Sequence, residues 1–327
     1  MDADVWEWFE RRSFHFRDFR GLAEGGGIQN RLTTTLVLPT RNVADTIGPI
    51  LDTVARLNDR SGLIEQVVVV DADSADGTAE IASARGAEVY SENELLPEYG
   101  GARGKGDAMW RSLSVARGDV VLFADSDTAG FGEHFIYGTL GPLLTAPGIQ
   151  FSKAAYRRPF TRDGNSVVDG GGRVTELTAK PLLNFFYPEL TGFVQPLAGE
   201  FAVHRELLCD IPFATGYGVE IAMLIDVYTR AGLPAMAQVG LGQRQNRHQS
   251  LWDLTRMSSE VLRALARRTG VPEREMAPHG APGVRPLPRP DTYLHAVATE
   301  DGLRLDEHPS GLPERPPLAH VLAGEVA

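Results

Sequence analysis

Short apolar runs alternate with segments of helical periodicity over the first 130 residues. Continuous apolar runs of this kind are typical of strands that are buried on both faces. The predicted strands are 32–39, 65–70, 87–90 and 120–123, and the predicted helices between them are 46–57, 78–84 and 105–116. This alternation predicts an α/β protein with a mostly parallel, doubly wound sheet.

After residue 130 the pattern is less regular. It predicts strands at 151–156 and 196–203 and helices at 174–186, 219–231 and 251–268. The first twenty residues are rich in Trp and Phe and predict an aromatic amphipathic helix, within an N-terminal extension of residues 1–30. Residues 271–327 hold ten of the 21 prolines and predict an extended tail, either disordered or wrapped on the surface, rather than a domain.

The composition is that of a soluble globular protein. The chain has 327 residues, is 43% hydrophobic and 23% charged, and has a formal net charge of −11. Because it is acidic and lacks a Lys/Arg run, we expect no nucleic-acid partner. The single cysteine, Cys209, excludes an internal disulfide, and its apolar neighbours predict a buried thiol. Without a signal-peptide pattern or an apolar run of about 18 residues, we expect a cytoplasmic protein that does not bind membranes.

Two carboxylates follow the apolar strand 120–123. Asp125 and Asp127 are spaced i, i+2, which in an extended chain places both side chains on one side, at the carboxyl end of the strand. Ligands bind at that end in open α/β sheets, and carboxylate oxygens suit Mg²⁺ or Mn²⁺. For this segment taken alone, the alternative is a solvated Asp-Ser-Asp turn.

A glycine-rich segment places Lys105 at the start of the helix 105–116. Glycines let backbone N–H groups approach a phosphate, and both the helix start and the lysine charge favour an anion. The segment is not a P-loop, because Tyr99 and Gly106 occupy the positions of the required glycine and Ser/Thr. Taken alone, it is also compatible with an ordinary loop that carries a surface lysine.

The strand 65–70 also ends in paired aspartates, Asp71 and Asp73. This resembles the first motif of haloacid dehalogenase phosphatases, but Ala75 stands at the Thr/Val position and no second paired-aspartate motif follows. We therefore favour a turn in which Asp71 or Asp73 faces a ligand.

Together these segments resemble a nucleotide-sugar glycosyltransferase of the GT-A fold. Longer strings at 156–159, 170–177, 195–200 and 216–221 resemble the glucosyl-3-phosphoglycerate synthases of actinobacteria, and they occur in the family's order. The resemblance runs from about residue 6 to 270 and leaves out the proline-rich tail. It implies a nucleotide-sugar-binding half at 31–130, an acceptor-binding half at 131–270 and a homodimer.

The resemblance further implies transfer of glucose from UDP-glucose to the 2-hydroxyl of 3-phosphoglycerate, with retention at the anomeric carbon and Mg²⁺ or Mn²⁺ as cofactor. The implied catalytic residues are Asp125, Asp127, Lys105 and Glu220. The implied donor-binding residues are Pro39, Thr40, Arg41, Asp71, Ala72, Lys105, Asp125 and Ser126. The implied acceptor-binding residues are Gly172, Arg173, Val174, Thr175, Tyr217, Arg244 and Asn246, and the implied metal ligands are Asp127 and His248.

The chain departs from the family at the base pocket and at the third metal ligand. The family has acidic residues where this chain has Asn42-Val43-Ala44, and it has Ser at the position of Ala72. The family's Arg-Glu-His-Arg-Asn corresponds to residues 244–248, Arg-Gln-Asn-Arg-His. A gap-free alignment places Asn246 at the metal, whereas a shift of two residues places His248 there; we favour His248 and keep both open.

These departures leave a second hypothesis, a GT-A glycosyltransferase of specialised metabolism with another donor, such as a GDP-sugar, or another small acceptor. A sugar-phosphate nucleotidyltransferase would need a glycine-rich loop after the first strand, where residues 38–41 read Leu-Pro-Thr-Arg. A non-catalytic sugar-binding protein would be indicated by loss of Lys105 or Asp127, and both are present. Because the sequence offers no clear nucleophile, we favour a front-face displacement as the route to retention.

Overall fold

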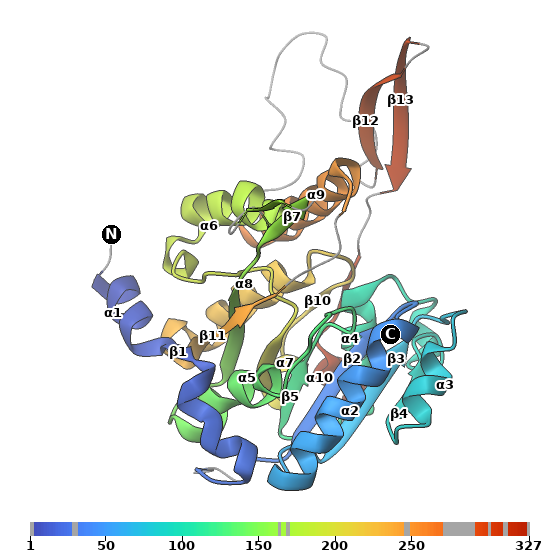
Figure 1. Cartoon of the computed structure of the whole chain (residues 1–327). Coiled ribbons are helices and arrows are strands. Elements are labelled where there is room, and N and C mark those ends of the chain that lie inside the picture. The colour runs from blue at the N-terminus through green and yellow to red at the C-terminus, as the bar shows by residue number, and fades with distance from the viewer. Residues whose placement is uncertain are drawn as a thin grey trace.

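The computed structural model describes residues 3–27, 32–162, 165–167, 171–244, 249–270, 292–299, 302–309 and 313–325. At its centre is an eight-stranded sheet with helices packed on both faces (Figure 1). In their order across the sheet the strands are β1 (Ser13–His15), β11 (Met236–Gln243), β6 (Phe151–Arg157), β9 (Phe201–His204), β5 (Val120–Phe123), β2 (Thr34–Thr40), β3 (Gln66–Asp71) and β4 (Glu88–Ser91).

The sheet is mostly parallel. Strand β9 runs antiparallel to both of its neighbours, β5 and β6, and the other adjacent pairs of this sheet are parallel. Because β9 pairs with one strand from residues 31–130 and one from 131–270, the two halves of the chain are hydrogen-bonded into a single sheet. The predicted mostly parallel, doubly wound α/β fold is thus confirmed.

Helices cover both faces of this sheet. The α-helices are α1 (Ala3–Arg12), α2 (Ala44–Ser61), α3 (Thr78–Ser83), α4 (Lys105–Ser112), α5 (His134–Thr145), α6 (Lys180–Phe186), α7 (Arg205–Cys209), α8 (Val219–Ala231), α9 (Leu251–Arg268) and α10 (Leu318–Leu322). Short 3₁₀ turns are η1 (Phe16–Glu24), η2 (Pro97–Tyr99), η4 (Pro188–Leu190) and η5 (Leu233–Ala235), and η3 (Thr175–Ala179) is a π-helical turn. Alternate residues of each strand enter opposite cores: Leu36 packs in the core that contains α2 and α5, and Val37 in the core that contains α4 and α8.

The N-terminal extension is not a single helix. α1 ends at Arg12, and β1 then pairs in parallel with β11 at the edge of the sheet. Trp8 donates from Nε1 to the carbonyl of Met236 at 2.8 Å, which packs the helix on the body, while Trp6 remains 69% exposed. Helical periodicity did not reveal β1, because its pairing is with a strand more than 200 residues away.

Among the elements that were not predicted, α5 and β11 are the longest in the body. Helix α5 contains glycines and a proline, which usually weaken helices. Gly141 is required by packing, since a Cβ there would lie 2.2 Å from Cγ of Phe19. The small residues therefore let η1 approach α5 closely.

The tail differs in part from the predicted extended or disordered segment. β12 (Thr292–Thr299) and β13 (Gly302–Pro309) form a hairpin that projects from the body in Figure 1. Farther along, β14 (Glu314–Arg315) pairs with β10 (Phe213–Ala214), and Leu318 of α10 is fully buried. An ion pair holds this last segment on the body, which agrees with the surface-wrapping alternative. A second small hairpin consists of β7 (Phe160–Arg162) and β8 (Asn165–Val167).

Two further sequence expectations can be compared with the structure. Cys209 is buried, as predicted, and burial raises the pKa of its thiol. None of the helices in the described ranges is both long and apolar enough to cross a membrane.

Candidate functional site

The candidate site lies where several strands end at the same edge of the sheet. The parallel strands β2, β3 and β5 lead to Thr40, Asp71 and Asp125 respectively. Because β9 runs the other way, the residues that precede it, Gly199 and Glu200, reach this edge as well. The topology therefore brings together side chains from both halves of the chain.

Lys105, the first residue of α4, joins two acidic residues of the site. Its Nζ lies 2.5 Å from Oδ1 of Asp125 and 2.7 Å from Oε1 of Glu220, which is near the start of α8. Burial lowers the pKa of Lys105, but the two carboxylates outweigh it and the pKa is raised. For Asp125 burial raises the pKa, but Lys105 and Arg244 outweigh it and the pKa is lowered. Lysine and aspartate are thus both charged at neutral pH.

Arg244 forms the second cationic centre. Its Nη2 lies 2.8 Å from Oδ2 of Asp125 and 3.3 Å from Oδ1 of Asp127, and its Nη1 lies 2.6 Å from Oε1 of Glu200. The hydroxyl of Tyr156 accepts a further bond from Nη1 at 2.9 Å. The Arg244 side chain is only 1% exposed. The resemblance implied that Arg244 lies at the acceptor. In the structure Arg244 is buried and forms ion pairs with the carboxyl groups of three residues of the site.

Asp127 is the most open carboxylate of this network. Its side chain is 51% exposed, although one oxygen lies close to Arg244. An accessible carboxylate oxygen suits a hard divalent cation. In the described part of the chain no three His, Cys, Asp or Glu side chains converge as a metal site. The two candidates for the further ligand, Asn246 and His248, lie outside the described residues.

Asp125 fits beside the start of β9 because residue 199 is glycine. A Cβ at this position would lie 2.2 Å from Oδ1 and 2.5 Å from Oδ2 of Asp125. Any side chain at residue 199 would therefore displace the carboxylate from Lys105 and Arg244. Residues 195–200 carry part of the family resemblance, but no role was predicted for Gly199 or Glu200.

Lys153 is a buried cation that the sequence analysis did not identify. It lies in β6, has no exposed surface, and donates from Nζ to the carbonyl of Ala198 at 2.8 Å. Its ammonium group also lies 4.9 Å from the ring centre of Phe201. Burial lowers the pKa of Lys153 to about 7, and nearby Glu220 opposes the shift. A lysine within an apolar strand was the signal that could have identified it.

The turn expected at the donor base is held by its own hydrogen bonds. Asp71 is buried; its carboxylate accepts from Thr40 Oγ1 at 2.7 Å and from the backbone N–H and the hydroxyl of Ser74, each at 2.7 Å. Both oxygens of Asp71 are therefore used inside the turn. Asp73 adopts a positive φ of 50° and accepts from Ser91 at 2.7 Å; this bond lowers the pKa of Asp73.

The other expected donor-binding residues lie around this turn. Ser126 donates from Oγ to the carbonyl of Pro39 at 2.6 Å, which joins the end of β2 to the segment after β5. Arg41 is exposed, and Ala72 is half-buried and donates from its backbone to Thr40. The turn and the Asp125–Asp127 segment thus form one edge.

The expected acceptor residues form the entry to a helix. Gly172 has a φ of +71°, and Val174 and Thr175 are buried where the helical segment begins. Arg173 is half-buried and donates from Nη2 to the carbonyl of Gln249 at 3.1 Å. Tyr217 is 50% exposed, and its backbone N–H donates to Glu260. Among the expected acceptor residues that the structure describes, Arg173 and Tyr217 have side chains open to solvent.

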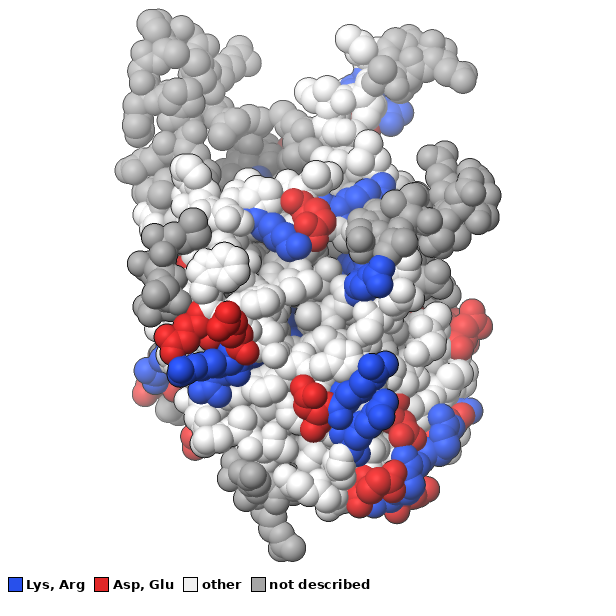
Figure 2. Space-filling view, turned by 60° about the vertical axis from the view of Figure 1, so that its left-hand side comes forward, with Lys and Arg blue, Asp and Glu red and all other residues white. Residues whose placement is uncertain are grey.

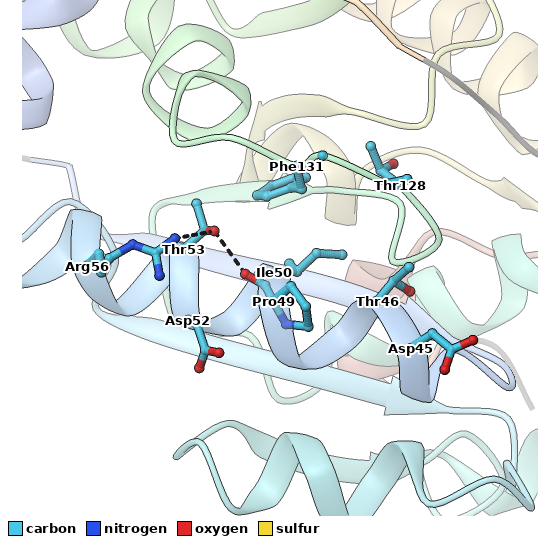
Figure 3. A pocket seen from close by; sticks show the side chains of 11 residues that line it. Asp45, Thr46, Pro49, Ile50, Asp52, Thr53, Arg56, Thr128 and Phe131 are labelled. Carbon is cyan, nitrogen blue, oxygen red and sulfur yellow. Dashed lines mark hydrogen bonds between the residues drawn. The ribbon is translucent and has the colours of Figure 1, made fainter.

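A separate cavity of about 460 Å³ lies between α2 and residues 128–131, directly after Asp127 (Figure 3). The carboxylates of Asp45 and Asp52 point away from Phe131 in that view, and Arg56 donates to Thr53 at 2.9 Å. The ionic network of Lys105 and Arg244 does not line this cavity. On the face that Figure 2 presents, basic and acidic side chains are interspersed, with no continuous patch of one sign. We therefore place the candidate site at the ionic network.

The chain is similar in sequence and in structure to known glycosyltransferases. Residues 35–135 match the family described as Glycosyl transferase family 2. A glucosyl-3-phosphoglycerate synthase of Mycolicibacterium paratuberculosis is 44% identical over 269 residues, 81% of each chain. The crystal structure of a mannosyl-3-phosphoglycerate synthase from Rubrobacter xylanophilus is 55% identical, with a TM-score of 0.85, covering 97% of this chain and 99% of that one. A Mycobacterium tuberculosis glucosyl-3-phosphoglycerate synthase in complex with Mn²⁺, UDP-glucose and phosphoglyceric acid is 40% identical, with a TM-score of 0.74, covering 91% of this chain and 93% of that one.

Proposed function

Because this chain belongs to the glycosyltransferase family of the glucosyl-3-phosphoglycerate synthases, with their GT-A fold, we propose that it transfers a hexosyl group from a nucleotide-diphosphate hexose to 3-phosphoglycerate. UDP-glucose is the first donor to test, since it is bound in the Mycobacterium tuberculosis relative. The observation that carries the proposal is the position of Lys105, 2.5 Å from Asp125 at the carboxyl edge of the sheet. There its charge can meet the donor's diphosphate.

A divalent cation, Mg²⁺ or Mn²⁺, fits the residues that are present. Two cations, Lys105 and Arg244, face four carboxyl groups, those of Asp125, Asp127, Glu200 and Glu220. This excess of carboxyl groups favours a cation, and the half-exposed Asp127 is the residue that would hold it, together with His248 or Asn246. When bound, the cation would neutralise negative charge on the leaving diphosphate.

The residues of the chain support a direct displacement at the anomeric carbon. The bond from that carbon to the phosphate oxygen breaks, the bond to the acceptor's 2-hydroxyl oxygen forms, and the hydroxyl proton passes to the departing phosphate oxygen. Lys105 stabilises the charge that develops on the leaving group. Asp125 and Glu220 are both ion-paired with Lys105, which disfavours either as a free nucleophile and supports front-face displacement with retention.

For the acceptor we propose the helix entry at residues 172–175 and the exposed Tyr217. The guanidinium group of Arg173 and the backbone N–H groups near Gly172 suit a carboxylate and a phosphate on one small molecule. This assignment corresponds to a nucleotide-sugar-binding half at 31–130 and an acceptor-binding half at 131–270. The buried side chains of Val174 and Thr175 leave their backbone as the group available to the acceptor.

Mannosyl transfer is a second candidate. The Rubrobacter xylanophilus structure, a mannosyl-3-phosphoglycerate synthase, shares 55% of its sequence with this chain, more than the glucosyl-3-phosphoglycerate synthases reported above. The segment after β2 carries Asn42, Val43 and Ala44 where the family has acidic residues, which is compatible with a different base. GDP-mannose is therefore the second donor to test.

A homodimer is also proposed. Apolar side chains are strongly exposed on α1 and on the continuous helical segment that η3 and α6 form. The exposed fractions are 69% for Trp6 of α1, 77% for Leu177 of η3 and 80% for Phe185 of α6. We expect these exposed side chains to lie in the subunit interface, where the partner would cover them. Analytical ultracentrifugation tests the proposal: a monomer at micromolar concentration would contradict it.

The function is tested by product formation with four donors, UDP-glucose, GDP-glucose, UDP-mannose and GDP-mannose, each with 3-phosphoglycerate and Mn²⁺ or Mg²⁺. A metal-dependent hexosyl-3-phosphoglycerate is the expected product, and the preferred donor distinguishes the two candidates. Thermal stabilisation by UDP or GDP without any product would point to another acceptor. If neither nucleotide binds in the presence of metal, the proposal is wrong.

A further inference from the structure

The last described segment of the chain, residues 313–325, is docked on the body; we call it the C-terminal strap. Its strand β14 pairs antiparallel with β10, with Arg315 opposite Phe213 and Glu314 opposite Ala214. The indole of Trp110 in α4 donates to the carbonyl of Pro316 at 2.8 Å. The strap therefore contacts α4, the helix that begins with Lys105, although the two are about 200 residues apart in sequence.

Arg315 of the strap reaches the buried first turn of α4. Its Nε lies 2.8 Å from Oδ1 of Asp107 and its Nη2 lies 2.6 Å from Oδ2, which is a two-bond fork between arginine and carboxylate. The Asp107 side chain has no exposed surface, and Arg315 is 9% exposed. Asp107 is two residues from Lys105, so the fork holds the turn that positions the Lys105 side chain.

The same cluster holds the loop that leads into Lys105. Arg315 donates from Nη1 to the carbonyl of Tyr99 at 2.9 Å. Arg111, fully buried and also paired with Asp107, donates to the carbonyls of Leu96 at 3.1 Å and Gly100 at 2.5 Å. The backbone N–H of residue 103 in turn donates to Oδ2 of Asp107 at 2.9 Å. Residues 96–103 are therefore tied along their length to one carboxylate and two arginines.

We infer that Arg315 is a positioning residue for donor binding: by holding Asp107 and the loop 96–103, it fixes Lys105 between Asp125 and Glu220. The inference rests on the proposed function, in which Lys105 meets the donor diphosphate. Lys105 can reach both carboxylates at 2.5 Å and 2.7 Å only while the start of α4 keeps its place. The strap is thereby part of the donor site without touching the donor.

Arg268, the last residue of α9, supplies a matched control because it binds the same strap from the body. It is 7% exposed and holds Glu314 at 2.8 Å and Asp226 of α8 at 2.5 Å. Replacing Arg268, like replacing Arg315, removes a buried arginine that attaches the strap. Arg268, however, contacts neither Asp107 nor the loop 96–103. A general loosening of the strap would affect both variants, whereas the proposed positioning is specific to Arg315.

The experiment compares Arg315→Met, Arg315→Lys and Arg268→Met by steady-state kinetics and by amide hydrogen exchange over residues 96–104. For Arg315→Met we expect kcat/KM for the donor to fall by about 10- to 100-fold, the acceptor KM to stay near the parent value, and exchange to accelerate. Arg315→Lys keeps the charge but loses the fork, so partial recovery is expected; it also serves if Arg315→Met does not fold. Arg268→Met should leave the donor kinetics and the exchange of the loop within about twofold of the parent.

Equal donor defects in Arg315→Met and Arg268→Met would overturn the inference, because the strap would then act only through stability. Faster exchange in Arg315→Met with unchanged donor kcat/KM would overturn it as well, because the loop would not position Lys105. Failure of the proposed function looks different: the parent enzyme itself would then form no product with any of the four donors. In that case the hydrogen exchange still tests whether Arg315 holds the loop.

Discussion

Replacing Lys153 by methionine should stabilise the folded protein near pH 6, and this gain should disappear as the pH rises to about 9. Lys153 has no exposed surface, and burial lowers its pKa from 10.5 to about 7. In the unfolded chain the pKa of Lys153 is near its ordinary value of 10.5. Between pH 7 and pH 10.5 the unfolded state therefore binds more protons than the folded state. By linkage, the free energy of unfolding then rises with pH from about 7 to about 10, and below pH 7 the full penalty of the buried charge is present.

The expected magnitudes follow from the pKa and from one hydrogen bond. A shift from 10.5 to about 7 corresponds to a penalty of about 5 kcal/mol below pH 7, which falls to about 2 kcal/mol at pH 9. Methionine removes this penalty but leaves the buried carbonyl of Ala198 unpaired, at a cost of about 1–3 kcal/mol. The variant should therefore be more stable than the parent at pH 6 and similar to it near pH 9.

Urea denaturation of parent and variant at pH 6, 7, 8 and 9 measures this difference directly. The difference should shrink by about 2–3 kcal/mol between pH 6 and pH 9. Ser152→Ala is the control, because Ser152 is a buried neighbour in β6 that does not titrate, so its effect on stability should be constant with pH. A constant difference for Lys153→Met would refute the argument, since it would mean that Lys153 binds protons equally in the folded and unfolded states, so that its pKa is not lowered by burial.

Three further changes test the site. Asp127→Ala should abolish metal-dependent turnover while the far-ultraviolet circular dichroism is unchanged, and near-normal activity would contradict the metal assignment. Arg173→Ala should raise the acceptor KM by about tenfold or more while hydrolysis of the donor continues; an unchanged acceptor KM in initial-rate assays would count against its role. Gly199→Ala should lower kcat by about 100-fold, because its Cβ would meet Oδ1 of Asp125 at 2.2 Å, and a fully active variant would show that the carboxylate can move without consequence.

The parts of the fold that sequence predicted best are those in which one local pattern determines the element. Strands β3 and β5 are continuous apolar runs that end in aspartates, and they were found within a residue or two of their true bounds. Helix α5 was missed because Gly138, Gly141 and Pro142 are poor helix formers that only the packing against η1 and its neighbours explains. Strand β1 is too short for a periodic signal, and its partner is at the far end of the chain.

In the candidate site, too, the residues that belong to local motifs were predicted, and the residues that only the tertiary structure brings there were not. Asp125, Asp127 and Lys105 belong to short motifs, so residue type and spacing indicated their chemistry in advance. Glu200 directly precedes the antiparallel strand β9, and Lys153 lies in the neighbouring strand β6. No local pattern shows that their side chains reach the edge of the sheet. The resemblance implied that Arg244 lies at the acceptor. It does not reveal that Asp125, Asp127 and Glu200 surround the guanidinium group of Arg244.

The pairing of β1 with β11 has a consequence for how the protein is made. Trp8 and its hydrogen-bond partner Met236 are 228 residues apart, so a ribosome that adds about 5–20 residues per second needs roughly 10–50 s to synthesise the stretch between them. Throughout that interval the apolar face of α1 emerges without the strand on which it finally packs. Strand β11 in turn completes its parallel edge only by pairing with a segment that was synthesised more than 200 residues earlier. The nascent chain therefore presents an aromatic surface until β11 has been synthesised, which is the kind of surface that chaperones bind.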